Sequence, residues 1–158
     1  MLRKWDALPK AMQNEKVRPY YEILQKTKLS LMGKRLFDII MSLLGIILLS
    51  PILVILAILI KIDSKGPVFF RQERFTTYGE SFRIFKFRTM VVNADKMGTL
   101  VTAKQDARIT KIGSKLRKYR LDELPQLFNI LKGEMSFIGP RPPLTYHPWP
   151  IEEYTPEQ

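Results

Sequence analysis

The chain of 158 residues is long enough to form one modest domain with a hydrophobic core. Its 26 Lys and Arg residues exceed its 15 Asp and Glu residues, and the net charge of +11 indicates anionic partners such as nucleic acid, lipid headgroups or phosphorylated substrates. Hydrophobic residues make up 46% of the chain, which excludes a disordered basic tail, and the absence of Cys excludes disulfides, thiolate zinc sites and cysteine nucleophiles. The single histidine, His147, cannot pair with a second histidine in a metal site, and we assign it no role.

The N-terminal part of the chain changes abruptly from basic to apolar. Residues 1–33 form a basic segment that Pro9 and Pro19 interrupt, and short amphipathic helices lying on a membrane are one interpretation of it. Residues 39–60 contain no charged side chain, and a straight helix of that length spans roughly 33 Å, about the thickness of the bilayer hydrocarbon. A buried core helix is the alternative, but so small a domain has too little protein to cover it on all sides. We therefore expect a membrane helix over residues 34–62.

Ser50 and Pro51 lie in the middle of this apolar run. Pro51 has no N–H to donate to the carbonyl of Ile47, and the Ser50 hydroxyl can satisfy part of the freed backbone, so a sharp kink is expected. Basic residues flank both ends of the run: Lys26, Lys28, Lys34 and Arg35 before it, and Lys61, Lys65, Arg71 and Arg74 after it. The positive-inside rule places both flanks in the cytoplasm, which favours a re-entrant helix, although ordinary spanning helices also carry kinks and basic flanks.

The segment after the apolar run is strongly basic. Residues 65–120 contain 14 Lys and Arg against 4 Asp and Glu. VFFRQERF and SFRIFKFRTM predict two strands joined by a turn at Tyr78 and Gly79, and strand alternation puts Lys86 and Arg88 on one face. The stretch from 106 to 118 predicts a loop that leads into a short basic helix.

A further helix is predicted within LDELPQLFNILKG, because apolar residues recur there at helical spacing: Leu124, Leu127, Phe128 and Leu131. Pro125 suits the first turn, Asp122 is then the N-cap, and Gly133 is the expected stop. A loop rich in Gly and Pro follows, then an acidic, Pro-rich tail over residues 146–158. We predict an α+β fold in which a single re-entrant, kinked membrane helix carries a small basic cytoplasmic domain of short strands and helices, residues 63–145.

Asp122 and Glu123 form an adjacent acidic pair within this basic region. Helix capping explains both residues, yet a helix N-terminus also attracts phosphate, where one carboxylate can attack phosphorus and a second can help to hold Mg²⁺. Six basic residues are candidates for phosphate binding, with solvated surface charges or lipid contacts as the alternative for each: Arg74, Lys86, Arg88, Arg108, Arg117 and Arg141. These residues alone indicate a membrane-surface protein that handles phosphorylated molecules, and they do not identify a reaction.

Several motifs follow one another in an order typical of one family: KRLFDI, the apolar run broken by SP, GPVFFRQER, FKFRTM, DARIT, LDELPQL and GEMSFIGPRP. Over residues 34–143 the chain resembles the bacterial sugar transferases, the monotopic polyprenyl-phosphate phosphoglycosyl transferases that initiate synthesis of exopolysaccharide, capsule or O-antigen. Family members continue beyond the GPRP motif, so we expect this chain to be truncated at its C-terminus. Phe75 and Thr76 also depart from the family, which usually has a glycine nearby.

The resemblance implies that Asp122 attacks a UDP-sugar, releases UMP and carries the phosphosugar covalently until polyprenyl (undecaprenyl) phosphate accepts it. It implies that Glu123, together with Asp122, binds Mg²⁺. It also implies a position on the cytoplasmic face of the bacterial inner membrane, in contact with membrane lipids. The resemblance further implies that Arg88, Arg117 and Arg141 handle phosphate or shape the site. It implies that Ser50 and Pro51 break the membrane helix.

Two other functions compete with this hypothesis. A non-catalytic membrane-surface module would bind lipid-linked phosphosugars or a partner transferase. Nucleic-acid binding would use the phenylalanines between residues 69 and 87 among the basic side chains, but the apolar run has no use there, and we expect no nucleic-acid partner. The sequence leaves open which sugar donor and which polysaccharide pathway the protein serves. It also leaves open whether so short a chain is active and whether it forms a homo-oligomer.

Overall fold

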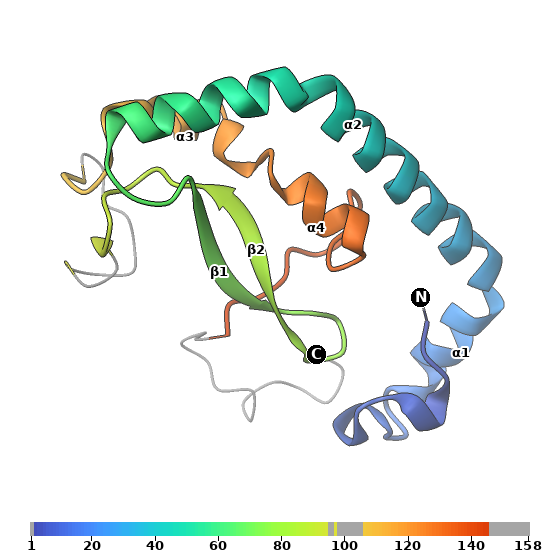
Figure 1. The fold of residues 1–158 in the computed structure, drawn as a ribbon. Helices are drawn as coiled ribbons and strands as arrows, with labels where there is room; N and C mark the ends of the chain where they lie inside the picture. The colour runs from blue at the N-terminus through green and yellow to red at the C-terminus, as the bar shows by residue number, and fades with distance from the viewer. Residues whose placement is uncertain (1, 95–96, 98–105, 146–158) are drawn as a thin grey trace.

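A computed structural model describes residues 2–94, 97 and 106–145 (Figure 1). The elements follow in the order η1 (Trp5–Ala7), η2 (Lys10–Met12), α1 (Arg18–Lys26), α2 (Lys28–Asp63), β1 (Phe69–Phe75), β2 (Ser81–Phe87), α3 (Lys111–Lys118), η4 (Leu121–Glu123) and α4 (Gln126–Lys132). The expected α+β class, a long apolar helix with a small sheet and short helices, is confirmed. His147 and the acidic tail lie outside the described residues.

Helix α2 is longer than expected and begins at Lys28, inside the segment that we had kept apart as basic and N-terminal. Figure 1 shows it bent along its length, so that it runs up one side of the molecule and then over the top. Pro51 lies within it without ending it, and the Ser50 hydroxyl donates a hydrogen bond of 2.8 Å to the carbonyl of Ile47. This is the carbonyl that Pro51 leaves without its helical donor, so the serine keeps the helix continuous through the proline.

Most of the apolar surface of α2 is uncovered. Among the described residues, α2 is the one helix that is long and apolar enough to cross a membrane by length and composition, and 6% of its most apolar stretch is buried. A core helix of a water-soluble domain would instead be covered on most sides. The exposed side chains therefore form an apolar surface that extends over much of the helix, including Leu36, Ile40, Leu44, Ile47, Leu48, Ile55 and Ile58.

The remaining side of α2 belongs to the core of the domain. Leu56 and Ile60 are buried against Phe87 at the end of β2 and Leu116 of α3. Earlier in the helix, α4 comes so close that a Cβ on Gly45 would lie 3.2 Å from a methyl group of Leu127. The helix that carries the exposed apolar surface thus also contributes side chains to the core of the domain.

The two strands form an antiparallel hairpin in which Phe69 pairs with Phe87 and Phe75 pairs with Ser81. The turn falls at Tyr78 and Gly79, as expected, and Gly79 takes a φ of 75°, which favours glycine. Phe82 and Ile84 are buried on one face of β2, and Phe87 at the end of the strand is buried in the core beside α2 and α3.

Asn129 joins the hairpin to α4. Its side chain has no solvent-exposed area, accepts a 2.8 Å hydrogen bond from the backbone N–H of Phe85, and donates to the carbonyl of Arg83 at 3.0 Å and to Glu134 at 2.6 Å. The amide therefore satisfies a donor and an acceptor on the edge of β2 and also holds the loop that follows α4. Asn129 and Ile130 are the buried residues of α4, while Leu127 and Leu131, which show the helical spacing, are partly buried.

The substitution Asn129→Ala should lower the free energy of unfolding by about 2–3 kcal/mol, because it removes three hydrogen bonds, two of them to partly buried backbone groups of β2. Thermal unfolding in detergent, followed by tryptophan fluorescence, would measure this against Gln25→Ala, which removes an exposed amide that bonds the nearby Tyr21 hydroxyl. Equal melting temperatures for the two variants would contradict the role of Asn129.

Candidate active site

The acidic pair lies in a tight connection between two short helices. Arg120 follows α3 in the left-handed region, with a φ of 58°, and turns the chain directly into the 3-10 turn η4 that contains Asp122 and Glu123. The expectation that Asp122 caps the next helix is wrong, because α4 begins at Gln126 behind Pro125, and Asp122 makes no capping hydrogen bond. Pro125 lacks an N–H and suits the position that opens a helix, which moves the start of α4 past the acidic pair.

The Asp122 carboxyl group is buried, with 9% of the residue exposed, and its Oδ1 atom has no hydrogen-bond partner among the described residues. Burial raises the pKa of Asp122 above its usual range, and the charge of Glu123 adds to this, whereas Lys86 and Arg117 act in the opposite direction. A buried carboxylate oxygen without a hydrogen bond costs free energy, so this atom does not stabilise the fold.

Glu123 has the opposite environment. Its Oε1 atom lies 3.1 Å from Lys86 Nζ, 3.0 Å from Arg141 Nη2 and 3.7 Å from Arg120 Nη1. Burial raises the pKa of Glu123, but the charges and hydrogen bonds of Lys86 and Arg141 outweigh it and bring that pKa below its ordinary value. The two adjacent carboxyl groups therefore differ in proton affinity, a separation that is typical of acidic pairs with different chemical roles.

Three of the six predicted basic residues act on this pair. Lys86, from the end of β2, and Arg141, from the loop after α4, contact Glu123 directly. Arg117 lowers the pKa of Asp122 through its charge, while its Nε donates to the Thr89 hydroxyl at 2.8 Å. Residues far apart in the sequence thus meet at η4 and surround the acidic pair with positive charge.

The other three basic residues contact protein groups. Arg88 is buried and donates to the carbonyls of Ser64 at 2.7 Å and Lys65 at 2.9 Å, just beyond the end of α2. Arg108 pairs with Asp106 at 2.6 Å and lowers its pKa to about 2 through hydrogen bonds. The phosphate-binding roles of Arg88 and Arg108 remain predictions.

Arg74, the last of the three basic residues that contact protein groups, reaches the loop that carries Arg141. Its guanidinium donates to the carbonyl of Pro142 at 2.7 Å and to the side chain of Gln72 at 3.1 Å. The backbone of Arg74 also forms an isolated antiparallel β-bridge with Leu144. Arg74 therefore positions the loop from which Arg141 contacts Glu123, so it acts on the acidic pair through the backbone.

Arg35, one of the basic residues that flank the apolar run, helps to support the site. It lies on α2 and donates to the carbonyls of Ile130 at 2.6 Å and Leu131 at 2.7 Å. These carbonyls are at the C-terminal end of α4, where a positive charge is favourable. Arg35 thus fixes α4, and with it η4, against α2; its spacing in the sequence carried no signal of this role.

Magnesium binding by the acidic pair stays a prediction. In the described part of the chain, no group of three or more Asp, Glu, His or Cys residues could hold a metal ion. Mg²⁺ often takes only one or two carboxylates and completes its shell with phosphate oxygens and water. Asp122 Oδ1, buried and without a partner, and the Glu123 carboxylate beside it could supply these two ligands.

The raised pKa of Asp122 makes a prediction about stability. A group whose pKa is raised by folding stabilises the protein at acidic pH, and this contribution is lost as the pH rises through that pKa. Asp122→Asn should therefore raise the free energy of unfolding at pH 7.5 by ~1 kcal/mol, and the difference should shrink towards pH 4. Thermal scans at both pH values would measure this, with the exposed Asp6→Asn as control. A lower melting temperature for Asp122→Asn at pH 7.5 would mean that the carboxylate stabilises the fold after all.

Comparisons with known proteins agree with the order of motifs found in the sequence. Residues 29–158 match the sequence profile of the bacterial sugar transferases. A Bacillus subtilis relative, named for transfer of N-acetylgalactosamine 1-phosphate to undecaprenyl phosphate, is 43% identical over 77% of this chain and 68% of its own length. A UDP-glucose:undecaprenyl-phosphate glucose-1-phosphate transferase of Klebsiella pneumoniae is 47% identical over 75% of this chain. A UDP-N-acetylgalactosamine-undecaprenyl-phosphate N-acetylgalactosaminephosphotransferase of Aeromonas hydrophila is 48% identical over 69% of it.

The matched region covers the acidic pair and all six basic residues discussed above. It spans 26% of the Klebsiella and Aeromonas proteins, which are much longer than this chain. Since the family profile accounts for most of the sequence, the chain belongs to the bacterial sugar transferase family.

Proposed function

We propose that the protein transfers a sugar 1-phosphate from a UDP-sugar to undecaprenyl phosphate in a membrane. The observation that carries this proposal is the buried Asp122 carboxyl group, whose Oδ1 has no partner among the described residues although cationic side chains surround the acidic pair. The substrates are those in the names of the Klebsiella and Aeromonas relatives. An unpartnered carboxylate in a positively charged site suits attack on a diphosphate, because the cations offset the repulsion between nucleophile and substrate.

In the first step, one oxygen of the ionised Asp122 carboxylate attacks the sugar-proximal phosphorus of the UDP-sugar. A bond forms between this oxygen and phosphorus, the bond from the same phosphorus to the bridging oxygen breaks, and UMP leaves with the electron pair. The product is an acyl phosphate that carries the sugar on Asp122. The raised pKa of Asp122 also makes it a stronger nucleophile once it is ionised.

In the second step, a phosphate oxygen of undecaprenyl phosphate attacks the same phosphorus. The acyl–oxygen bond to phosphorus breaks, the Asp122 carboxylate is released, and the product is undecaprenyl diphosphosugar. Glu123 stays ionised throughout, because Lys86 and Arg141 hold its pKa low. A bound Mg²⁺, held by Asp122 and Glu123, would neutralise phosphate charge in this site.

The membrane arrangement belongs to the same proposal. The exposed apolar side of α2 would enter the cytoplasmic leaflet of the bacterial inner membrane, bend near Pro51 and return, which leaves Lys34 and Lys61 at the same surface. A re-entrant helix of this kind would hold the acidic pair beside the headgroups, within reach of a phosphate that is anchored by its lipid chain.

The first prediction concerns the nucleophile. Purified protein in nanodiscs, supplied with Mg²⁺, undecaprenyl phosphate and a panel of UDP-sugars, should release UMP from one donor, and Asp122→Asn should lower the rate by roughly 10³-fold or more. The matched control is Asp6→Asn, which removes an exposed carboxylate of η1 and should leave the rate unchanged. No lipid-dependent release with any donor would overturn the proposal and favour a non-catalytic module that binds lipid-linked phosphosugars.

The second prediction concerns pH. Only the ionised form of Asp122 attacks, so the single-turnover rate of UMP release should rise with pH through a midpoint above the ordinary aspartate value. Lys86→Gln removes a charge that lowers this pKa and should shift the midpoint to higher pH. Lys115→Gln on α3 makes the same charge change at an exposed position and should leave the midpoint in place. A midpoint in Lys86→Gln that is equal to or below that of the unchanged protein would refute the coupling.

A further inference from the structure

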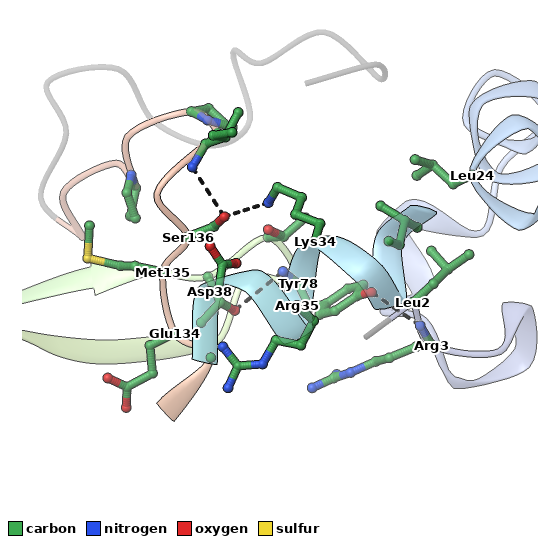
Figure 2. Close-up of a pocket in the computed structure, with 18 of the residues that line it drawn as sticks. Leu2, Arg3, Leu24, Lys34, Arg35, Asp38, Tyr78, Glu134, Met135 and Ser136 are labelled. Atoms are coloured by element: carbon green, nitrogen blue, oxygen red, sulfur yellow. Dashed lines mark hydrogen bonds between the residues drawn. The ribbon is translucent and has the colours of Figure 1, made fainter. Parts of the chain in front are cut away.

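A large cavity lies between the N-terminal segment and the family domain. Its volume is about 1010 Å³, and four parts of the chain line it: the N-terminal segment, the first turns of α2, the hairpin turn and the loop after α4. Figure 2 shows Lys34, Arg35 and Asp38 of α2 beside Ser136, with Leu2, Arg3 and Leu24 toward the N-terminal side. Arg141 also lines the cavity and contacts Glu123, so the cavity adjoins the candidate active site.

The N-terminal wall is held in place by specific contacts. Arg3 pairs with Glu80 at 2.7 Å, its guanidinium lies 4.4 Å from the centre of the Tyr78 ring, and its carbonyl accepts a 3.0 Å hydrogen bond from the Tyr21 hydroxyl. The ring of Trp5 packs against the edge of Tyr21. The family match begins at residue 29, so this wall lies outside the matched region, and it contacts the hairpin turn through Arg3.

The lining is cationic. Seven cationic and three acidic residues contribute to it, the cationic ones being Arg3, Lys4, Lys28, Lys34, Arg35, Lys132 and Arg141. Each acidic residue is engaged: Glu80 with Arg3, Asp38 with the N–H of Phe137, and Glu134 with Asn129. Because the cationic residues still outnumber the acidic ones, the lining carries a net positive charge.

Lys34 lines the cavity beside Ser136 (Figure 2). Its ammonium group bonds the Ser136 hydroxyl at 2.5 Å, and it makes no ion pair within the described residues. The same hydroxyl also accepts the N–H of Ile138 at 3.3 Å. An ammonium group and a hydroxyl side by side form a suitable pair of donors for one phosphate group.

The cavity is also partly apolar. Leu24, Leu31, Met32 and Ile138 are among its lining residues. Leu24, Met32 and Ile138 are exposed, and Met32 adjoins the exposed apolar side of α2. A soluble anion would gain nothing from this surface, whereas a lipid could place its headgroup against Lys34 and its chains along α2.

We propose that this cavity binds the phosphate of an anionic phospholipid, with Lys34 and Ser136 as its headgroup contacts and the N-terminal segment as its closing wall. The site is separate from the position of the transferred phosphosugar at Asp122. A lipid bound there would fasten the N-terminal segment and the start of α2 to the membrane surface beside the active site.

The test is lipid binding by the purified chain, measured by native mass spectrometry from detergent that contains either phosphatidylglycerol or phosphatidylcholine. The protein should retain phosphatidylglycerol in preference, and Lys34→Gln should weaken its binding about fivefold, the effect of one lysine at a lipid surface. Lys28→Gln, on the same rim and more exposed, should weaken binding in the same direction. The exposed Lys115→Gln on α3 should leave it unchanged.

Three outcomes would overturn this proposal. Equal loss of lipid in Lys34→Gln and Lys115→Gln would reduce the effect to net charge. Displacement by inorganic phosphate at the concentration of the lipid headgroup would make the cavity a site for free phosphate, and stoichiometric displacement by undecaprenyl phosphate would make it the acceptor site. Asp122→Asn should bind phosphatidylglycerol as the unchanged protein does, so the result is independent of whether UMP release succeeds.

Discussion

The structure depends on a helix that protein covers on one side only. The inner side of α2 supplies Leu56 and Ile60 to the core, and its Arg35 binds the C-terminal carbonyls of α4. The outer side stays apolar and exposed. A helix with both properties cannot be removed as a simple anchor, because the domain would lose part of its core together with its apolar surface. The Ser50 hydrogen bond to Ile47 preserves that helix through Pro51, where the backbone would otherwise lose a donor.

The acidic pair gains its character from what surrounds it. Arg120 in the left-handed region and Pro125 at the start of α4 confine Asp122 to a short turn, where its carboxylate is buried and caps nothing. Lys86 and Arg141 arrive from the hairpin and from the final loop and hold Glu123 ionised. Two adjacent carboxyl groups thus differ in pKa because burial dominates at one and paired charge dominates at the other.

The many basic residues serve different purposes. Arg88 binds the chain just beyond α2, Arg74 holds the loop of Arg141, and Arg108 pairs with Asp106, so these three contact protein. Lys86, Arg117 and Arg141 act on the acidic pair, and Lys34 lies in the cavity by the N-terminal segment. The net charge of +11 could not separate the charges that hold the fold together from those that act on the acidic pair or line the cavity.

The sequence by itself determined the apolar helix, the hairpin with its turn at Tyr78 and Gly79, the Ser50 contact to Ile47, and the family, because these depend on local periodicity, turn chemistry and motif order. It placed the end of α4 at Gly133 for the same reason. Only the tertiary structure decided that Asp122 is buried without capping a helix, that Asn129 of α4 is buried against β2, and that Arg35 supports that helix. These features arise from contacts between residues distant in the chain, where burial and charge from several elements combine, and a linear pattern of residue types does not contain them.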